Sequence, residues 1–320
     1  MVLQKLIPLL EPAAHNALRH VLATGAVAFG QSPPTKEPDF VAAFVLGGTV
    51  AIATAWSAIL RPHRISMTIQ SVYCHGSPLV VFPPTRKGAG LASPSRCELA
   101  DLLLVIDDTT AGSPPARRAS LVQAKMAAST SGSITLSGTD LVQLDLMQNW
   151  PTFTFPDKGY DPRTRNFAGG VLPPVAQSSG RYGLIDRGLS PPDWQQVAPA
   201  HKMTIRGVDL GAFLARMADR PPNAEGRAAT IGGTDDWSFT IEELLKVTGV
   251  RTFKRPSITT RQLRGASHLL HLIVPEPSGT SLRLGYRWSD RGGGADLPPI
   301  EDVPPRNGIS SVWVRFGNDE

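Results

Sequence analysis

Cysteine is nearly absent from this chain of 320 residues, which contains only Cys74 and Cys97. Two cysteines cannot build a disulfide framework or complete a four-cysteine zinc site, so a stapled extracellular module and a zinc ribbon are both disfavoured. Charge is scarce too, because charged residues make up 18% of the chain and the formal net charge is +5. With no recognisable export signal near the amino terminus, these observations predict a cytoplasmic protein.

The motifs of several common enzyme classes are also missing. The chain has no G-x-S-x-G, P-loop, G-x-G-x-x-G or H-E-x-x-H, which argues against the commonest hydrolases, NTPases, dinucleotide-binding enzymes and metalloproteases. His268 and His271 lie three residues apart and would face opposite sides of a strand. Cys74 and His75 are adjacent and would also point apart, so we interpret both pairs as structural.

Only one long hydrophobic run is present, at residues 41–60, and it contains no charged residue. Its length is that of a membrane span, and Arg61 follows directly. Many of its residues are Ala, Gly, Thr or Ser, which gain little from transfer into lipid but suit a helix packed closely on a sheet. Pro38 and Asp39 are typical of a helix start. We therefore favour a buried helix over a membrane span.

The remaining apolar patterns predict an alternation of strands and helices. Before residue 156, we expect a helix at 41–60, strands at 64–73, 78–82, 99–106 and 119–125, a helix at 139–150 and a short strand at 152–155. After it, we expect helices at 210–218 and 240–247 and strands at 269–274 and 309–316. These elements predict an α/β fold with a mixed central sheet flanked by helices. We expect a core at 1–156 and an accessory α/β region at 157–320, packed on the core as one domain.

Two neighbouring expected strands carry groups suited to phosphodiester chemistry. Asp101 stands at the head of the buried strand ELADLLLVID, and the next strand ends in Gln123-Ala124-Lys125. Gln123 and Lys125 share one face of that strand, while Ala124 turns to the other. A carboxylate and an amide oxygen suit a hard divalent cation, and an ammonium group can orient a water or stabilise charge on a phosphate. The sequence therefore predicts one site formed by Asp101, Gln123 and Lys125.

These residues and the order of helix, three strands, helix and strand resemble the PD-(D/E)xK, or restriction-endonuclease-like, nuclease superfamily. The resemblance covers about half of the chain, with Asp101 as the motif aspartate and Lys125 as the motif lysine. Gln123 replaces the usual acid, as in the Mrr-like subgroup with its Q-x-K signature. The resemblance implies a nuclease that uses magnesium or manganese, with DNA a better expectation than RNA. It also implies, by analogy alone, a role in restriction or anti-phage defence.

The glutamine has a physical consequence for the metal site. One carboxylate fewer makes the site less negative, so it should hold magnesium more weakly unless another acid contributes. We name Glu98 as that ligand, and Glu37 or Asp39 at the start of the first helix as alternatives. A catalytically degenerate nuclease fold that binds nucleic acid or assembles with a partner remains the main alternative function. A simple structural role for Asp101 and Lys125 also remains open.

A basic segment lies in the second half of the chain. Residues 251–264 contain five basic side chains and no acid, with Phe253 among them. Such a segment can follow a phosphate backbone, although a solvated basic face explains it equally well. The predicted nucleic-acid-binding residues are Arg251, Lys254, Arg255, Arg261 and Arg264.

Overall fold

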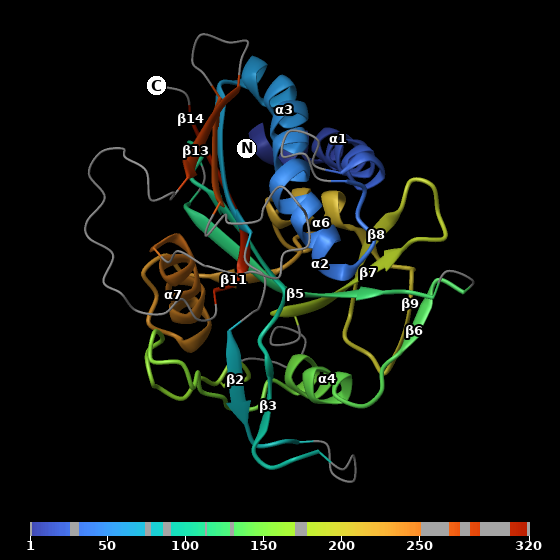
Figure 1. Cartoon of the computed structure of the whole chain (residues 1–320). Coiled ribbons are helices and arrows are strands. Elements are labelled where there is room, and N and C mark those ends of the chain that lie inside the picture. The colour runs from blue at the N-terminus through green and yellow to red at the C-terminus, as the bar shows by residue number, and fades with distance from the viewer. Residues whose placement is uncertain are drawn as a thin grey trace.

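The structure is a computed structural model of the whole chain (Figure 1). It describes residues 2–25, 32–73, 78–85, 91–112, 114–128, 131–169, 178–250, 269–275, 282–288 and 308–318. The predicted basic residues of the segment 251–264, together with Cys74, His75 and His268, lie outside these described residues. His271 lies on a strand.

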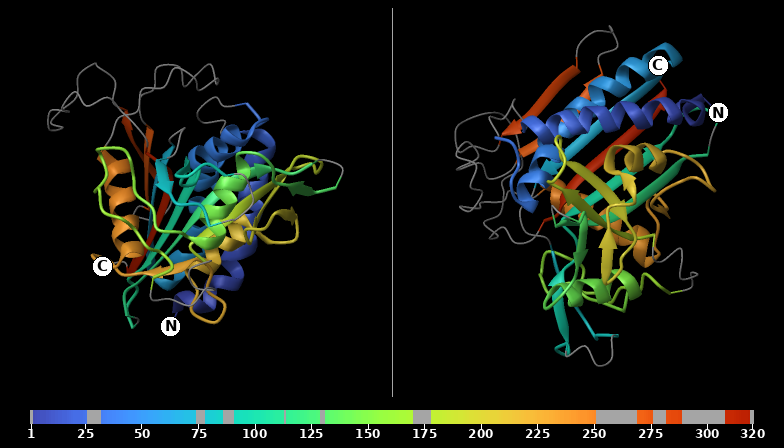
Figure 2. Two further views of the ribbon diagram at one scale, coloured as in Figure 1. Left: turned by 90° about the horizontal axis from the view of Figure 1, so that it is seen from below. Right: turned by 90° about the vertical axis from the view of Figure 1, so that its right-hand side faces the viewer.

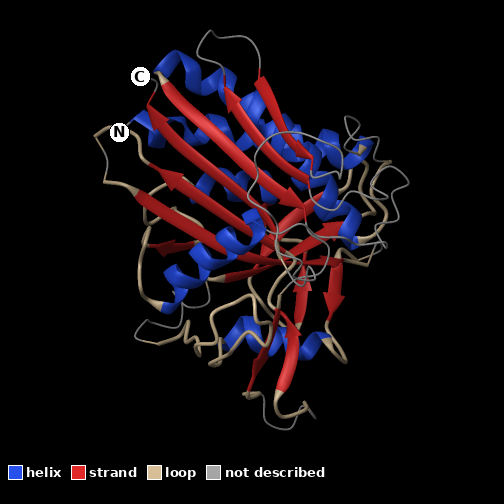
Figure 3. Cartoon of the chain, turned by 60° about the vertical axis from the view of Figure 1, so that its left-hand side comes forward, coloured by secondary structure: helices blue, strands red, loops and turns tan. Residues whose placement is uncertain are grey.

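A ten-stranded mixed sheet forms the centre of the protein (Figure 3). Its main path runs in the order β10-β8-β7-β5-β4-β14-β1-β12-β13, and β11 pairs with β5. The pairs β14–β4 and β5–β7 are parallel and the other pairs are antiparallel. The strands are β1 (Ile65–Tyr73), β4 (Leu102–Asp108), β5 (Ala116–Met126), β7 (Gly180–Asp186), β8 (Asp193–Val197), β10 (Val208–Asp209), β11 (Arg227–Ala229), β12 (Leu269–Pro275), β13 (Leu282–Trp288) and β14 (Ser310–Asn318).

Helices cover both faces of this sheet, and Figure 2 shows α7 and the layer of α1 and α3 on opposite sides of it. One layer contains α1 (Val2–Thr24), α2 (Glu37–Ala43), the π-helical turn η2 (Phe44–Gly48), α3 (Thr49–Leu60) and α6 (Leu210–Met217). The other contains α4 (Asp140–Asn149), α7 (Asp236–Val250) and the small sheet of β2 (Leu79–Phe82) and β3 (Ser95–Glu98). The short elements η3 (Arg61–His63), β6 (Ser133–Thr135) and β9 (Lys202–Thr204) complete the described elements. The predicted α/β class with a mixed, helix-flanked sheet is confirmed.

The long apolar helix packs inside the protein, as predicted. By length and composition the helix Glu37–His63 could cross a membrane, but most of its apolar part is buried, as in the core helix of a soluble protein. Trp56 donates its ring N–H to the backbone oxygen of Leu10 in α1, at 2.9 Å. At Gly48, a Cβ atom would come within 3.0 Å of Leu18. The small residues of this helix therefore allow its close contact with α1.

The two strands that carry the predicted site behave as their patterns indicate. Every residue of β4 is buried, as expected for a strand covered on both faces. Along β5 the side chains alternate, so that Ala124 joins the apolar layer of α1, α3 and α6, and Leu121 joins the layer of α4 and α7. Gln123 and Lys125 share the face of Leu121.

Several details differ from the sequence predictions. Residues 152–155 form only isolated bridges at Phe153 and Thr154, because Pro151 and Pro156 flank this short run, and the strand that follows α4 is instead β7. The run at 78–82 lies outside the central sheet and pairs with β3, which was not predicted. Between β1 and β4 lies β14, from the carboxyl end of the chain. Strands from both sides of residue 156 thus belong to one sheet, an arrangement that local patterns cannot reveal.

Candidate active site

The different lengths of β4 and β5 create the place where the predicted residues meet. Pairing between the two strands ends at Leu102 opposite Val122, so β5 continues past the start of β4. Asp101 lies directly before β4, and its N–H donates to the Val122 oxygen at 3.0 Å. Its side chain turns toward the extension of β5, where Oδ2 accepts from the N–H of Ala124 at 2.8 Å. The carboxylate therefore binds a backbone group that β4 does not reach.

Gln123 and Asp101 are in direct contact, as the sequence predicts. The Gln123 side-chain amide donates from Nε2 to Asp101 Oδ2 at 2.5 Å. The other end of this amide, Oε1, accepts a hydrogen bond from Nε2 of Gln143 on α4. Gln143 also donates to the backbone oxygen of Glu98, at 3.3 Å. A chain of hydrogen bonds thus runs from α4 through Gln123 to Asp101.

Lys125 lies on the same face of β5 and contacts the first turn of α4. Its Nζ atom is 2.8 Å from Oδ1 of Asp140, the first residue of that helix. The Lys125 side chain is 15% exposed and that of Asp140 is 34% exposed, so this pair lies closer to solvent than the buried side chains of Gln123 and Gln143. Asp140 and Gln143 were not predicted as site residues. Their signal was the i, i+3 spacing on the expected helix, which places both on one face.

A further carboxylate reaches the site from α2. Glu37 begins this helix, and its Oε1 accepts from the N–H of Met126 at 3.0 Å. The N–H groups of Ala124 and Met126 both lie beyond the end of β4, so Asp101 and Glu37 occupy successive unpaired positions along β5. Asp39 instead accepts from the N–H groups of Thr35 and Lys36. Of the two predicted alternatives on this helix, Glu37 is therefore the one near the site.

The charges of these residues act strongly on Asp101. Burial raises its pKa from 3.8, and the charges of Glu98 and Glu37 raise it further. The Ala124 hydrogen bond and the Lys125 charge lower the pKa, but the net result is a pKa of about 7. A carboxyl group with this pKa is partly protonated near neutral pH, chiefly because it is buried and secondly because other carboxylates lie near it.

Negative charges also raise the pKa of Lys125, and for this residue a higher pKa favours the charged form. Burial lowers its pKa, but the hydrogen bond to Asp140 and the charges of Glu37, Asp140 and Asp101 raise it more. The net pKa lies above its usual value, so the ammonium form persists at neutral pH. Lys125 is therefore suited to stabilising negative charge rather than to accepting a proton.

The donor set suits a hard cation, but the acids do not form a compact cage. Asp101 Oδ1 has no hydrogen-bond partner among the described residues, so it is available as a ligand. Asp101 and Glu37 bind N–H groups two residues apart, a separation of roughly 7 Å along a strand. Accordingly, within the described part of the chain, these acids are not among the groups of three ligand residues whose atoms lie within 4.8 Å of one another. A cation held here would have Asp101 as its first ligand.

A compact group does occur elsewhere, at His15, Asp193 and Asp209. His15 Nδ1 lies 3.0 Å from Oδ2 of Asp209, whose Oδ1 accepts from the N–H of Gly211 at the start of α6. Asp193 accepts from the N–H of Trp194 and from the side chain of Gln195. The contact between His15 and Asp209 and the cap at the start of α6 account for this group without a ligand.

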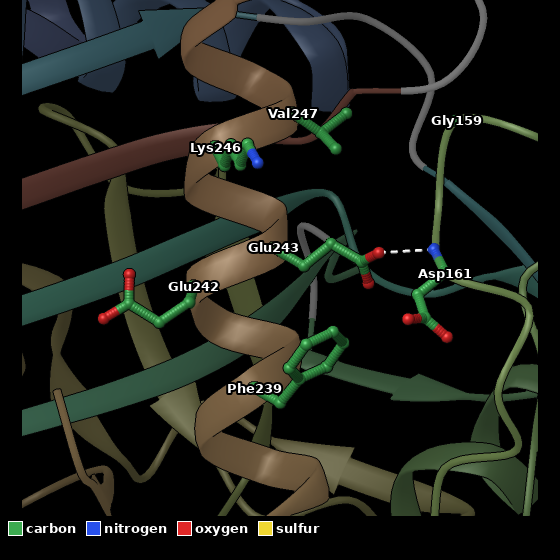
Figure 4. A pocket seen from close by; sticks show the side chains of 7 residues that line it. All are labelled: Gly159, Asp161, Phe239, Glu242, Glu243, Lys246 and Val247. Carbon is green, nitrogen blue, oxygen red and sulfur yellow. Dashed lines mark hydrogen bonds between the residues drawn. The ribbon is translucent and has the colours of Figure 1, made fainter. Parts of the chain in front are cut away.

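A separate cavity of about 510 Å³ lies between α7 and the loop near residue 160 (Figure 4). Its acids are already engaged, because Glu243 pairs with buried Arg165 and accepts from the N–H of Asp161 at 2.5 Å, and Glu242 pairs with Arg117. None of the predicted site residues lines this cavity. The lining residues are Gly159, Asp161, Phe239, Glu242, Glu243, Lys246 and Val247.

Comparison of the chain with models of protein families, with curated proteins and with solved structures finds no match. The interpretation of this site therefore depends on its own residues and their geometry.

Proposed function

We propose that this protein is a metal-dependent nuclease that hydrolyses phosphodiester bonds, with Asp101, Gln123 and Lys125 at its active site. One observation carries the proposal: where the pairing of β4 with β5 ends, the Asp101 carboxylate contacts the Gln123 amide, and the charge of Lys125 on the same strand acts on this carboxylate. The charges of Glu37 and Glu98 raise the pKa of Asp101, and those of Glu37, Asp140 and Asp101 raise the pKa of Lys125. Such an excess of negative charge next to a lysine is typical of a site that binds a cation.

In this proposal, magnesium or manganese is bound by Asp101, with Gln123 and Glu98 as further ligands and Glu37 as an additional acid. When bound, the cation would polarise the phosphate and activate a water molecule. Gln123 turns its amide nitrogen toward Asp101 and its oxygen toward Gln143, so the amide would have to rotate to offer its oxygen to a cation held by Asp101. Lys125 remains protonated and stabilises the negative charge that develops on the phosphate. Asp140 holds the Lys125 ammonium group in place.

The proposed substrate is DNA rather than RNA, and the proposed setting is the cytoplasm, in restriction or anti-phage defence. These finer statements derive from the family resemblance. The basic residues predicted to bind nucleic acid in the segment 251–264 would supply contacts to the phosphate backbone.

Cleavage assays with matched variants test the proposal. Purified full-length protein should degrade fluorescently labelled DNA in the presence of Mg²⁺ or Mn²⁺ and lose this activity with EDTA. Asp101→Ala and Lys125→Ala should each reduce the rate at least 100-fold, because each removes a group placed at the reacting phosphate. Asp186→Asn and Lys202→Ala, outside the site, are the charge-matched controls. Equal activity in the wild type and both site variants would contradict the proposal.

A degenerate nuclease fold that binds nucleic acid without cleaving it is the second candidate. It is favoured by the hydrogen bond from Gln143 to Gln123 and by the role of Asp101 and Glu37 in binding the unpaired N–H groups of β5. Calorimetry separates the two functions. Two results together would support the degenerate form. The protein would bind DNA without any divalent cation, and the heat measured on adding Mn²⁺ would be the same in the wild type and in Asp101→Asn.

A further inference from the structure

A buried tyrosine on β7 adjoins the proposed active site. Tyr182 lies directly opposite Gln123 in the parallel pairing of β5 and β7. Its side chain is fully buried in the layer of α4 and α7, the layer that the Gln123 face of β5 adjoins. Figure 1 shows β7 beside β5, with α4 next to these strands. Tyr182 therefore forms part of the buried floor of the site.

The hydroxyl group of Tyr182 is enclosed and has no hydrogen-bond partner among the described residues. A buried donor without an acceptor costs about 1–3 kcal/mol, so such groups normally bind protein or ordered water. Burial raises the pKa of Tyr182 above its usual value, and the charges of Asp140, Cys97 and Asp101 raise it further. The hydroxyl is thus close enough to the site acids for their charges to act on it.

An unused acceptor belongs to the same site. Asp101 engages Oδ2 twice, with the amide of Gln123 and the N–H of Ala124, whereas Oδ1 has no partner among the described residues. A nucleic-acid strand cannot reach a fully buried phenol, but a water molecule can, provided that at least two polar groups hold it. Tyr182 and Asp101 supply a donor and an acceptor for such a water.

We propose that Tyr182 is a positioning residue of the active site, which holds an internal water molecule against the free oxygen of Asp101 and so orients this carboxylate for the divalent cation. The water gives the enclosed Tyr182 hydroxyl the acceptor that it lacks among the described residues. Its second role, the orientation of a cation ligand, rests on the proposed nuclease function. Tyr182 acts through Asp101 and does not touch the substrate.

Fluorine NMR of full-length protein labelled with 3-fluorotyrosine tests the contact without any metal. The chain has four tyrosines, and Tyr182→Phe assigns the resonance of interest by its loss. In metal-free protein, Asp101→Asn should shift the Tyr182 resonance and leave that of Tyr160 in place. Tyr160 is the matched control, because it is buried in the same apolar layer. An unshifted Tyr182 resonance would overturn the proposed contact, whether or not the protein binds a cation.

Titration with cations tests the orienting role. Addition of Mg²⁺ should shift the Tyr182 resonance in the wild type but not in Asp101→Asn. Tyr182→Phe should weaken Mn²⁺ binding about 3- to 10-fold by calorimetry with an unchanged melting temperature, and Tyr160→Phe should leave Mn²⁺ binding unchanged. If Tyr182→Phe were more stable than the wild type and bound Mn²⁺ with unaltered affinity, the Tyr182 hydroxyl would hold no water molecule, and the proposal would be overturned. If the wild type bound neither Mg²⁺ nor Mn²⁺, the nuclease function and the orienting role would both be contradicted. The metal-free spectra would still test the water-mediated contact between Tyr182 and Asp101.

Discussion

The hairpin of β4 and β5 carries a polar group of residues at each end, and the two groups differ in how their charges are balanced. At one end, Arg117 donates to both carboxylate oxygens of Asp107, at 2.6 and 2.7 Å, and also pairs with Glu242. Trp313 donates to Asp107 as well, at 2.9 Å. At the other end, Asp101 Oδ1 has no hydrogen-bond partner among the described residues, and the pKa of Asp101 is about 7. We call the first group the closed end of the hairpin, because its charges are paired, and the second group, which contains the proposed metal site, the open end.

Arg117, Gln123 and Lys125 lie on the same face of β5, so the backbone alone does not separate the two groups. The difference arises from what packs against each end. Near Asp107, α7 and β14 bring a glutamate and an indole that complete the pairing. Near Asp101, α2, α4 and the end of β3 bring carboxylates, which add to the negative charge. Four experiments test how far this contrast extends.

The largest effect is expected at the closed end. Arg117→Met leaves Asp107 buried without its cation, which should lower the free energy of unfolding by about 3–5 kcal/mol. Urea unfolding followed by tryptophan fluorescence measures it. Arg163→Met is the control, because Arg163 pairs with Asp161 at the surface, where such pairs contribute less than about 1 kcal/mol. Equal losses in the two variants would show that the Arg117 network is not a closed buried unit.

The pH dependence of the free energy of unfolding should reveal the raised pKa of Asp101. The pKa of Asp101 is about 7 in the folded protein and has its ordinary value of 3.8 in the unfolded chain. The folded state therefore binds this proton more tightly, and its contribution to stability is present below about pH 4 and lost as the pH rises toward 7. Asp101→Asn should remove this loss, which amounts to a few kcal/mol. An unchanged pH profile of urea unfolding between pH 4 and 7 would contradict the raised pKa.

Gln123→Glu introduces, next to Asp101, the acid that the motif usually has at this position. It replaces a donated hydrogen bond by two facing carboxylates, so metal-free protein should lose about 1–3 kcal/mol of stability. Millimolar Mg²⁺ should restore most of this loss in thermal melts, since a cation neutralises both acids. Gln4→Glu is the matched control, because Gln4 also donates to an aspartate, Asp108, at 3.2 Å, and Asp108 lies outside the site. Equal rescue of both variants by Mg²⁺ would contradict a specific site.

The smallest effect is expected for the pair of Lys125 and Asp140. This pair is partly exposed, so Asp140→Asn should lower the free energy of unfolding by less than about 1 kcal/mol. The measurement is again urea unfolding. A loss as large as that of Arg117→Met would mean that the Lys125 end is also a closed structural network, and the contrast between the two ends would disappear.

Much of the site follows from local sequence patterns. The alternation in LVQAK correctly predicts that Gln123 and Lys125 share a face and that Ala124 points into the opposite layer. The apolar run before it predicts that β4 is buried and that Asp101 lies at its start. Asp140 and Gln143 follow from helical spacing only once the orientation of α4 is known. Tyr182 has no local signal, because its place opposite Gln123 results from a parallel pairing across more than fifty residues.

The sequence by itself determined the α/β class, the buried apolar helix and the face on which each motif residue lies, because side-chain periodicity depends only on the local backbone. Only the tertiary structure decided that β14 separates β1 from β4, that β5 extends past the end of β4, and that Glu37 rather than Asp39 reaches this extension. These features depend on strand pairing between distant segments. Such pairing is set by packing of the whole chain, which no local pattern encodes.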